Sequence, residues 1–221
     1  MRLRRTLLFT LLPLFASCQV YTGKPVDEQA AMIRMQGQLQ FSGEQLIFTP
    51  CGEKRQFVIK NDASSNLRDD AKALYDDGAS TLQVDMRGLL GSADSNDGSF
   101  KPDTVYRLQR EGELCNDLAY RLTKVRASGH EPDWHIGVSA QGLLLERPGQ
   151  KALVLPYLEE QLPEGRMSIS SEANGNRVEL WVTPQHCVDS MSGAVSHLSA
   201  ELRINGQVMR GCGYFGGAQP R

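Results

Sequence analysis

Hydrophobic and polar residues alternate with a period of two along much of the chain, which is the pattern of half-buried β-strands. In the first half this pattern occupies residues 38–41, 46–49, 55–59, 81–86 and 105–108. Between the third and fourth of these segments, apolar residues recur at helical spacing instead and predict one helix over 67–75. Three strands, a helix and two further strands are the order expected of a small OB-like barrel.

The second half is almost entirely β in pattern, and two of its hairpins can be assigned a register. Asn174-Gly175 and Asn205-Gly206 each suit a two-residue type I′ turn, because both central residues of that turn need positive φ. In both hairpins the apolar residues then fall together on one face, and this agreement between turn and alternation specifies the register. The expected cross-strand pairs are Met167 with Val182, Ile169 with Leu180, and Leu202 with Met209.

These patterns predict a mainly β protein made of two small β domains. We expect an OB-like β domain with one helix over 36–120 and an antiparallel β domain over 121–221. The boundary between them is expected near 118–128.

The N-terminus carries an export signal. Residues 1–17 combine three arginines with an apolar run too short to span a bilayer, as in a secretory signal peptide. Small residues then precede Cys18, as in the lipobox of bacterial lipoproteins, in which the cysteine is diacylated and becomes the first residue of the mature chain. Ordinary cleavage after Ala16 or Ser17 is the alternative, and it would leave Cys18 a free thiol.

The expected destination is the outer membrane. Residues 18–35 are predicted to form a lipidated tether, so the lipid on Cys18 is the expected contact with the membrane. Residue 19 is Gln and not the Asp that marks inner-membrane retention in enteric bacteria. The body of the protein is therefore expected to face the periplasm.

Composition and charge exclude several classes of protein. With 221 residues, 40% of them hydrophobic, the chain is long enough to bury a core and is not disordered as a whole. Its formal net charge is −2, and loss of the signal arginines would make it more negative. Because nucleic-acid binders carry a positive footprint, we expect no nucleic-acid partner.

The five cysteines fit an exported lipoprotein. Lipidation of Cys18 leaves four, which can pair in an oxidising compartment in three ways. Two fall in each half of the chain, so the economical pairing is Cys51 with Cys115 and Cys187 with Cys212. A metal–thiolate site is the alternative, but the chain has no C-x-x-C spacing, and we expect neither a metal nor a cofactor.

Three segments carry a family resemblance: G-H-E-P-D-W at 129–134, C-V-D-S-M-S-G at 187–193 and R-G-C-G at 210–213. They resemble a widespread family of uncharacterised bacterial envelope lipoproteins whose members carry G-N-E-P-x-W and C-x-D-S-M-S-G segments. The resemblance implies that the second half is similar to META/HslJ-type β domains. Phe48–Gly52 is similar to a segment of the OB-like part of NlpE-type lipoproteins.

The resemblance covers most of 36–215 and is strongest over 126–215, but it implies no particular activity. Two positions depart from the family pattern. His130 replaces the usual Asn, and His197 stands where an aromatic residue is common.

Six residues are candidates for binding or for a role in the family motifs: Glu131, Trp134, Trp181, Asp189, Met191 and Ser192. Trp134 is expected on an inward face, whereas Trp181 alternates with the core residues of its strand and is expected at the surface. Paired carboxylates can run acid–base chemistry, so a hydrolase would require Glu131 and Asp189 to converge in one cleft. The chain has no H-x-x-x-H or H-E-x-x-H spacing and no G-x-S-x-G segment, so we assign no catalytic residue.

The sequence therefore predicts an outer-membrane lipoprotein with a binding or structural role in the cell envelope, and not an enzyme. An envelope protein is its expected partner. A sensor of surface or copper stress, or an inhibitor of a lysozyme, is the alternative, and a hydrolase acting on the cell wall or on lipid is a further one.

Overall fold

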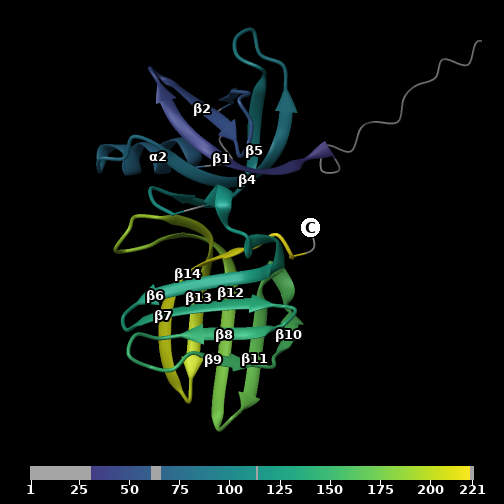
Figure 1. Cartoon of the computed structure of the whole chain (residues 1–221), viewed down its shortest axis with the longest axis vertical. Coiled ribbons are helices and arrows are strands. Elements are labelled where there is room, and N and C mark those ends of the chain that lie inside the picture. Colours follow the sequence, from purple (N-terminus) through teal and green to yellow (C-terminus); the bar gives the residue numbers. More distant parts are fainter. Residues whose placement is uncertain (1–30, 61–65, 113, 220–221) are drawn as a thin grey trace, which may run out of the picture.

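The computed structural model describes residues 31–60, 66–112 and 114–219. The predicted signal segment 1–17 and the lipidation site Cys18 lie outside the described residues. The described chain is mainly β with one α-helix, and it forms two β bodies stacked along the long axis of the molecule (Figure 1). The predicted fold class, mainly β with an OB-like barrel, is confirmed.

The first body is a closed five-stranded barrel. Its strands follow the order β3-β2-β1-β4-β5, and a parallel pairing of β3 with β5 closes the ring. The single helix connects β3 to β4, as the sequence predicts. The elements are β1 (Ile33–Ser42), β2 (Gln45–Pro50), β3 (Phe57–Ile59), α2 (Leu67–Asp76), β4 (Leu82–Gly91) and β5 (Ser99–Gln109).

Helix α2 covers the barrel core with its apolar face. Leu67, Ala71 and Leu74 are buried, at the spacing that brings residues onto one side of a helix. They join a core that includes Phe48 and Phe100 from the strands.

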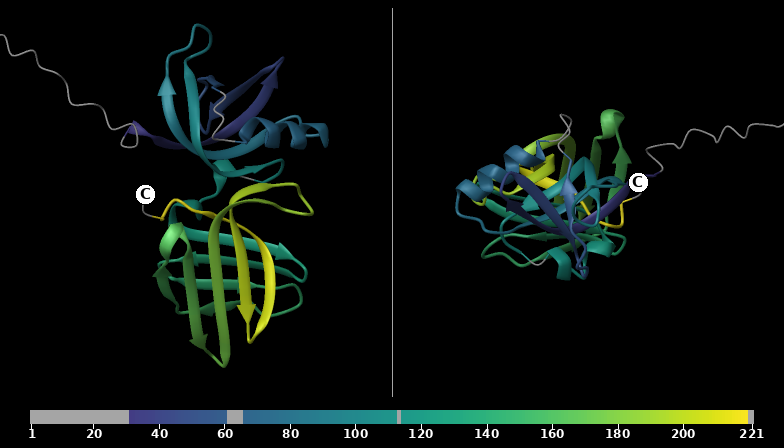
Figure 2. Two further views of the ribbon diagram at one scale, coloured as in Figure 1. Left: turned by 180° about the vertical axis from the view of Figure 1, so that it is seen from behind. Right: turned by 90° about the horizontal axis from the view of Figure 1, so that it is seen from above.

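The second body is an antiparallel sheet of nine strands that folds over on itself. Seen from behind (Figure 2), β11 to β14 run along the long axis and cross β6 to β9, and the core lies between these two layers. Short 3-10 turns at Leu114–Asn116, Tyr120–Leu122 and Pro163–Gly165 complete the chain. The strands are β6 (Thr123–His130), β7 (Asp133–Ser139), β8 (Gly142–Glu146), β9 (Leu153–Leu155), β10 (Leu158–Gln161), β11 (Met167–Ala173), β12 (Asn176–Val188), β13 (Val195–Ile204) and β14 (Gln207–Phe215).

Both predicted hairpin registers are confirmed. Met167 pairs with Val182 and Ile169 with Leu180 across β11 and β12, and Leu202 pairs with Met209 across β13 and β14. The four residues of the two turns all have positive φ, at +53° and +72° in the first turn and +50° and +90° in the second.

Both predicted disulfides are present. Cys51–Cys115 ties the end of β2 to the segment that leaves β5, and Cys187–Cys212 ties β12 to β14. The Cα atoms are 5.4 and 5.6 Å apart, within the usual range for disulfides. Each bridge therefore lies within one half of the chain, and neither crosses between the two bodies.

The two bodies share one continuous sheet, because β5 of the barrel pairs with β13 of the second body. Leu108 lies opposite Val195 and Arg107 opposite Ser196. Val195 accordingly packs into the barrel core and not into the core of its own half.

A buried ionic network reinforces this junction. Arg34 of β1 binds the fully buried Asp85 of β4 through two hydrogen bonds of 2.8 and 2.7 Å. The same guanidinium also donates to the backbone carbonyls of Phe215 and Gly216 at the end of the second body. One arginine therefore connects both bodies.

Candidate functional site

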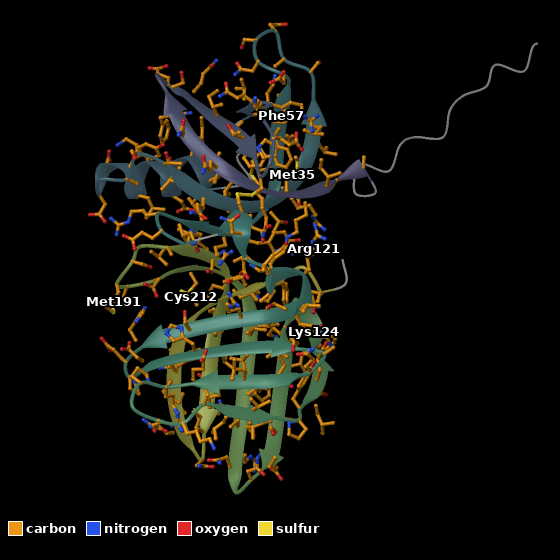
Figure 3. The ribbon with its side chains drawn as sticks, viewed as in Figure 1. Met35, Phe57, Arg121, Lys124, Met191 and Cys212 are labelled. Carbon is orange, nitrogen blue, oxygen red and sulfur yellow. A yellow bond between two sulfur atoms is a disulfide. The ribbon has the colours of Figure 1, made fainter. Side chains whose placement is uncertain are left out.

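The candidate site is a groove of about 470 Å³ at the junction of the two bodies, hereafter the junction groove. Its lining comes from β6, β7, β8 and β14, from β5 and β13, and from the turn between β12 and β13. A neighbouring hollow of about 410 Å³ shares His130 and Ser192 with it. Figure 3 shows Met191 and Cys212 at the end of the second body that faces the first. The polar residues of the lining are Arg107, Gln109, Arg126, Ser128, His130, His135, Glu146, Asp189, Ser192, Ser196 and Tyr214.

His130, at the end of β6, lies between two carboxylates. Its Nδ1 is 3.1 Å from Asp133 Oδ1 and its Nε2 is 2.8 Å from Asp189 Oδ2. Carboxylates only accept, so this geometry suits an imidazolium that donates from both nitrogens. Burial by itself lowers the pKa of His130, but the two carboxylates outweigh it and the net pKa is raised.

Asp189 organises the turn that borders the groove. Its Oδ1 accepts hydrogen bonds from the backbone N–H groups of Met191 and Ser192 and from the Ser192 hydroxyl. Burial opposes ionisation, yet the bonds from Ser192 and His130 lower the pKa of Asp189 below its usual value. The carboxylate is therefore charged and its two oxygens are already engaged, so it acts as the centre of the turn.

The turn is also fixed to the barrel. Arg110, just after β5, donates to the Ser192 carbonyl and pairs with Asp77 at the end of α2. A second link joins His186 of β12 to Asp70 of α2 at 3.0 Å. The wall of the groove is thus attached to both bodies.

A cationic cluster lies on the other side of the groove. Arg107 of β5 donates from Nη1 to the Tyr214 hydroxyl at 2.7 Å, and its guanidinium carbon is 4.2 Å from the centre of the Tyr214 ring. Arg126 of β6 pairs with Asp117 at 3.2 Å. Burial alone would lower the pKa of Arg126, but Tyr214 and Asp117 beside it raise it above its usual value.

Two of the six candidate binding residues lie in this groove and one borders it. Asp189 and Ser192 line it, and Met191 projects from the same turn with 72% of its surface exposed. Glu131 is exposed in the turn between β6 and β7, and it does not contribute to the lining of the groove.

The two tryptophans lie away from the groove. Trp134 is fully buried in the core, where it packs opposite Gly129. Trp181 is 39% exposed on the outer face of β12, as its alternation predicts, with the Arg203 guanidinium 5.8 Å from its ring. Gly129 and Trp134 of the G-x-E-P-x-W segment therefore serve packing.

The sequence patterns did not predict a site role for Arg107, Arg126 or Tyr214. Arg107 carried a signal, since it is a cation inside a strand whose neighbours are mostly apolar. Arg126 alternates with core residues on β6. No local pattern predicts that β5 and β14 bring Arg107 and Tyr214 together.

Within the described residues, no group of three or more His, Cys, Asp or Glu side chains is placed to hold a metal ion. In the same part of the chain, no helix has the length and apolar character needed to cross a membrane. Comparison with protein-family models, with curated proteins and with solved structures found no match to this chain. The function must therefore be argued from the geometry of the site.

Proposed function

We propose that this protein is a lipid-anchored binding protein of the outer membrane that faces the periplasm and holds an envelope component in the junction groove. The anchoring rests on the signal pattern of 1–17 and on the small residues before Cys18. The two disulfides support an oxidising compartment.

One observation carries the binding role: charged and polar groups from both bodies converge on one groove and are held there by fixed partners. Arg107 comes from the barrel, whereas His130, Asp189 and Tyr214 come from the second body. Their strands belong to one continuous sheet, so the groove is organised before any ligand arrives. Preorganised polar groups in a concave site are typical of specific binding.

The state of Asp189 favours binding over hydrolysis. A general acid or base has to exchange a proton with the substrate, whereas this carboxylate already accepts four hydrogen bonds from Met191, Ser192 and His130. Glu131, its proposed partner in a hydrolase, lies outside the lining of the groove.

A role as a sensor or as an inhibitor of a lysozyme is the second candidate, and the exposure of Met191 favours it. The turn at 189–193 projects an apolar side chain at the rim of the groove while its backbone stays fixed by Asp189 and Arg110. A rigid protruding turn of this kind suits contact with a protein.

Two measurements test the proposed function. The first is mass spectrometry of native protein: wild type should carry acyl chains on Cys18, and Cys18→Ser should be unmodified and lost from the outer-membrane fraction. An unmodified Cys18 in wild type would remove the anchoring.

The second is photo-crosslinking in intact cells from a benzophenone residue at position 191, with position 208 as the matched control. Val208 is also exposed, but it lies in the β13–β14 hairpin at the end away from β5. A reproducible adduct from 191 and none from 208 supports contact of the groove rim with an envelope protein. The same adducts from both positions, or none from either, would count against the sensor or inhibitor role.

A further inference from the structure

Arg107 is a buried cation with two side-chain nitrogens that make no hydrogen bond. The residue is 8% exposed, and its Nη1 is bonded to the Tyr214 hydroxyl. Its Nε and Nη2 are both buried and have no hydrogen-bond partner among the described residues. An unsatisfied buried donor is costly, and a buried charge without a counterion more so.

In another arginine of this protein, the same two nitrogens, Nε and Nη2, bind a carboxylate. Arg34 grips Asp85 with its Nε at 2.8 Å and its Nη2 at 2.7 Å. These two N–H groups lie on one edge of the guanidinium and match the spacing of two oxyanion oxygens. In Arg107 the same two nitrogens have no carboxylate partner among the described residues.

The carboxylates around Arg107 are engaged by other groups. Asp85 lies opposite Arg107 in the β4–β5 register, but Arg34 and Gln36 bind it. Asp117 pairs with Arg126, and Asp189 with His130. Glu146 also lines the groove, on β8 at the far end of the strand order from β5.

We propose that the junction groove binds small molecules that carry a carboxylate or phosphate group, with the guanidinium of Arg107, turned so that its Nε and Nη2 edge faces the groove, as the principal contact. This inference rests on the proposed binding role of the groove and names its ligand class. The groove volume of about 470 Å³ is in the range of small-molecule sites.

Neighbouring groups complete the recognition. The Tyr214 hydroxyl accepts from Arg107, which leaves its own proton free to be donated to a ligand oxygen. Arg126 has a side chain that is 42% exposed, so it adds a second positive charge at a more accessible position in the same groove. Because the buried guanidinium of Arg107 has no counterion, an anion that pairs with it would compensate its charge.

The first experiment measures binding to the purified full-length chain by calorimetry and by the shift in melting temperature. The probes are inorganic phosphate, succinate and neutral succinamide, each at the same ionic strength. Stabilisation by phosphate alone, by succinate alone or by both supports the proposal and identifies the preferred oxyanion. If neither anion binds at millimolar concentration, or if succinamide binds as well as succinate, the proposal is wrong.

The second experiment uses Arg107→Met and Arg107→Lys, with Arg210→Gln as the matched control. Arg210 lies on β14 outside the groove with a side chain that is 82% exposed, so its loss removes one positive charge without touching the site. The Met variant should weaken anion binding by at least about tenfold, and the Lys variant, which keeps the charge but loses the edge, by several-fold. The control should stay within about twofold of wild type. Equal weakening by all three variants would show a diffuse charge effect and overturn the proposal.

A third readout needs only folded wild-type protein. The Nε–H signal of Arg107 in a nitrogen–proton NMR spectrum should move on addition of the anion, while the Nε–H signal of Arg34 stays fixed. An unmoved Arg107 signal at saturating anion contradicts the proposal even if a variant fails to fold. Suppose that wild type binds neither anion but is acylated on Cys18 and crosslinks from position 191. This inference would then be refuted, and the proposed function would stand.

Discussion

His130 shows how one side chain fixes the wall of the junction groove. It joins the β6–β7 turn, through Asp133, to the β12–β13 turn, through Asp189. A neutral ring can donate from only one nitrogen, so the two bonds together need the protonated ring. The position of His130 between two carboxylates therefore makes the wall sensitive to pH.

The first prediction concerns the ion pair of His130 with Asp189. The folded pKa of His130 is raised from 6.5, so its contribution to stability is present below about pH 6.5 and is lost as pH rises through the folded value. The folded pKa of Asp189 is lowered from 3.8, so its contribution is present above that pH and is lost as pH falls.

The melting temperature of wild type should exceed that of His130→Gln most clearly between these limits, and the difference should shrink at alkaline pH. Melting curves of both proteins across the pH range measure this. A difference that grows at alkaline pH would contradict the pairing.

The second prediction concerns His197, which packs between the rings of Tyr106 and Phe215 at the junction. Burial lowers the pKa of His197 to about 4, and the nearby Arg34 adds to this effect. The unfolded chain gains a proton near pH 6.5 while the folded chain does not, so stability falls between about pH 6.5 and 4. The loss is on the order of 3 kcal/mol.

His197→Phe keeps the ring packing and removes this titration, so it should lose less stability over that pH interval than wild type. Denaturant titrations at both ends of the interval give the comparison. His135→Gln, at an exposed histidine, is the control and should retain the acid sensitivity of wild type. If His197→Phe is as acid-sensitive as wild type, the buried ring is not the source.

At the scale of elements, the hairpins could be predicted because their signals are local. Asn174-Gly175 and Asn205-Gly206 determine the turn type, and alternation then determines which residues face the core. The order of strands and helix in the barrel could be predicted for the same reason, since each element has its own pattern.

The third prediction concerns the packing of β6 against β7. A Cβ at Gly129 would lie 2.2 Å from the Arg210 carbonyl oxygen and 2.6 Å from Trp134 Nε1. Gly129→Ala should therefore destabilise the protein by about 1–3 kcal/mol, as overpacking of a core does. Gly137→Ala on β7 is the matched control, because nothing lies within 4 Å of its new Cβ, and it should change stability by less than about 1 kcal/mol. Denaturant unfolding measures both, and equal effects would argue against close packing at Gly129.

The junction groove could not be predicted in the same way. It depends on the pairing of β5 with β13, whose residues are far apart in the sequence, and no turn or periodicity encodes that contact. The motif residues drew attention to Asp189 and Ser192, which do line the groove, but also to Trp134, which is core. Arg107 becomes a candidate only when its unpartnered nitrogens are seen in three dimensions.

At the scale of the whole molecule, the two bodies are joined by more than a linker. The continuous sheet, the Arg34–Asp85 pair and the contacts of Arg110 with the 189–193 turn all cross or adjoin the junction. Since the groove is built from both bodies, any movement between them would separate Arg107 from Tyr214. The shared sheet and the contacts across the junction predict that the two bodies unfold together.

The fourth prediction tests this cooperativity through Arg34. Arg34→Met leaves the buried Asp85 without its cationic partner, and breaking a buried pair in this way costs about 3–5 kcal/mol. The double variant Arg34→Met/Asp85→Leu removes both charges and should recover a large part of that loss. Lys72→Met, at an exposed pair with Asp76 on α2, is the control and should cost less than about 1 kcal/mol.

Calorimetry of wild type should show one unfolding transition. Arg34→Met should lower the temperature of this transition or divide it into two, because this arginine also binds the carbonyls of Phe215 and Gly216. Two separate transitions in wild type would mean that the bodies unfold independently, and the contacts across the junction would then not couple their unfolding.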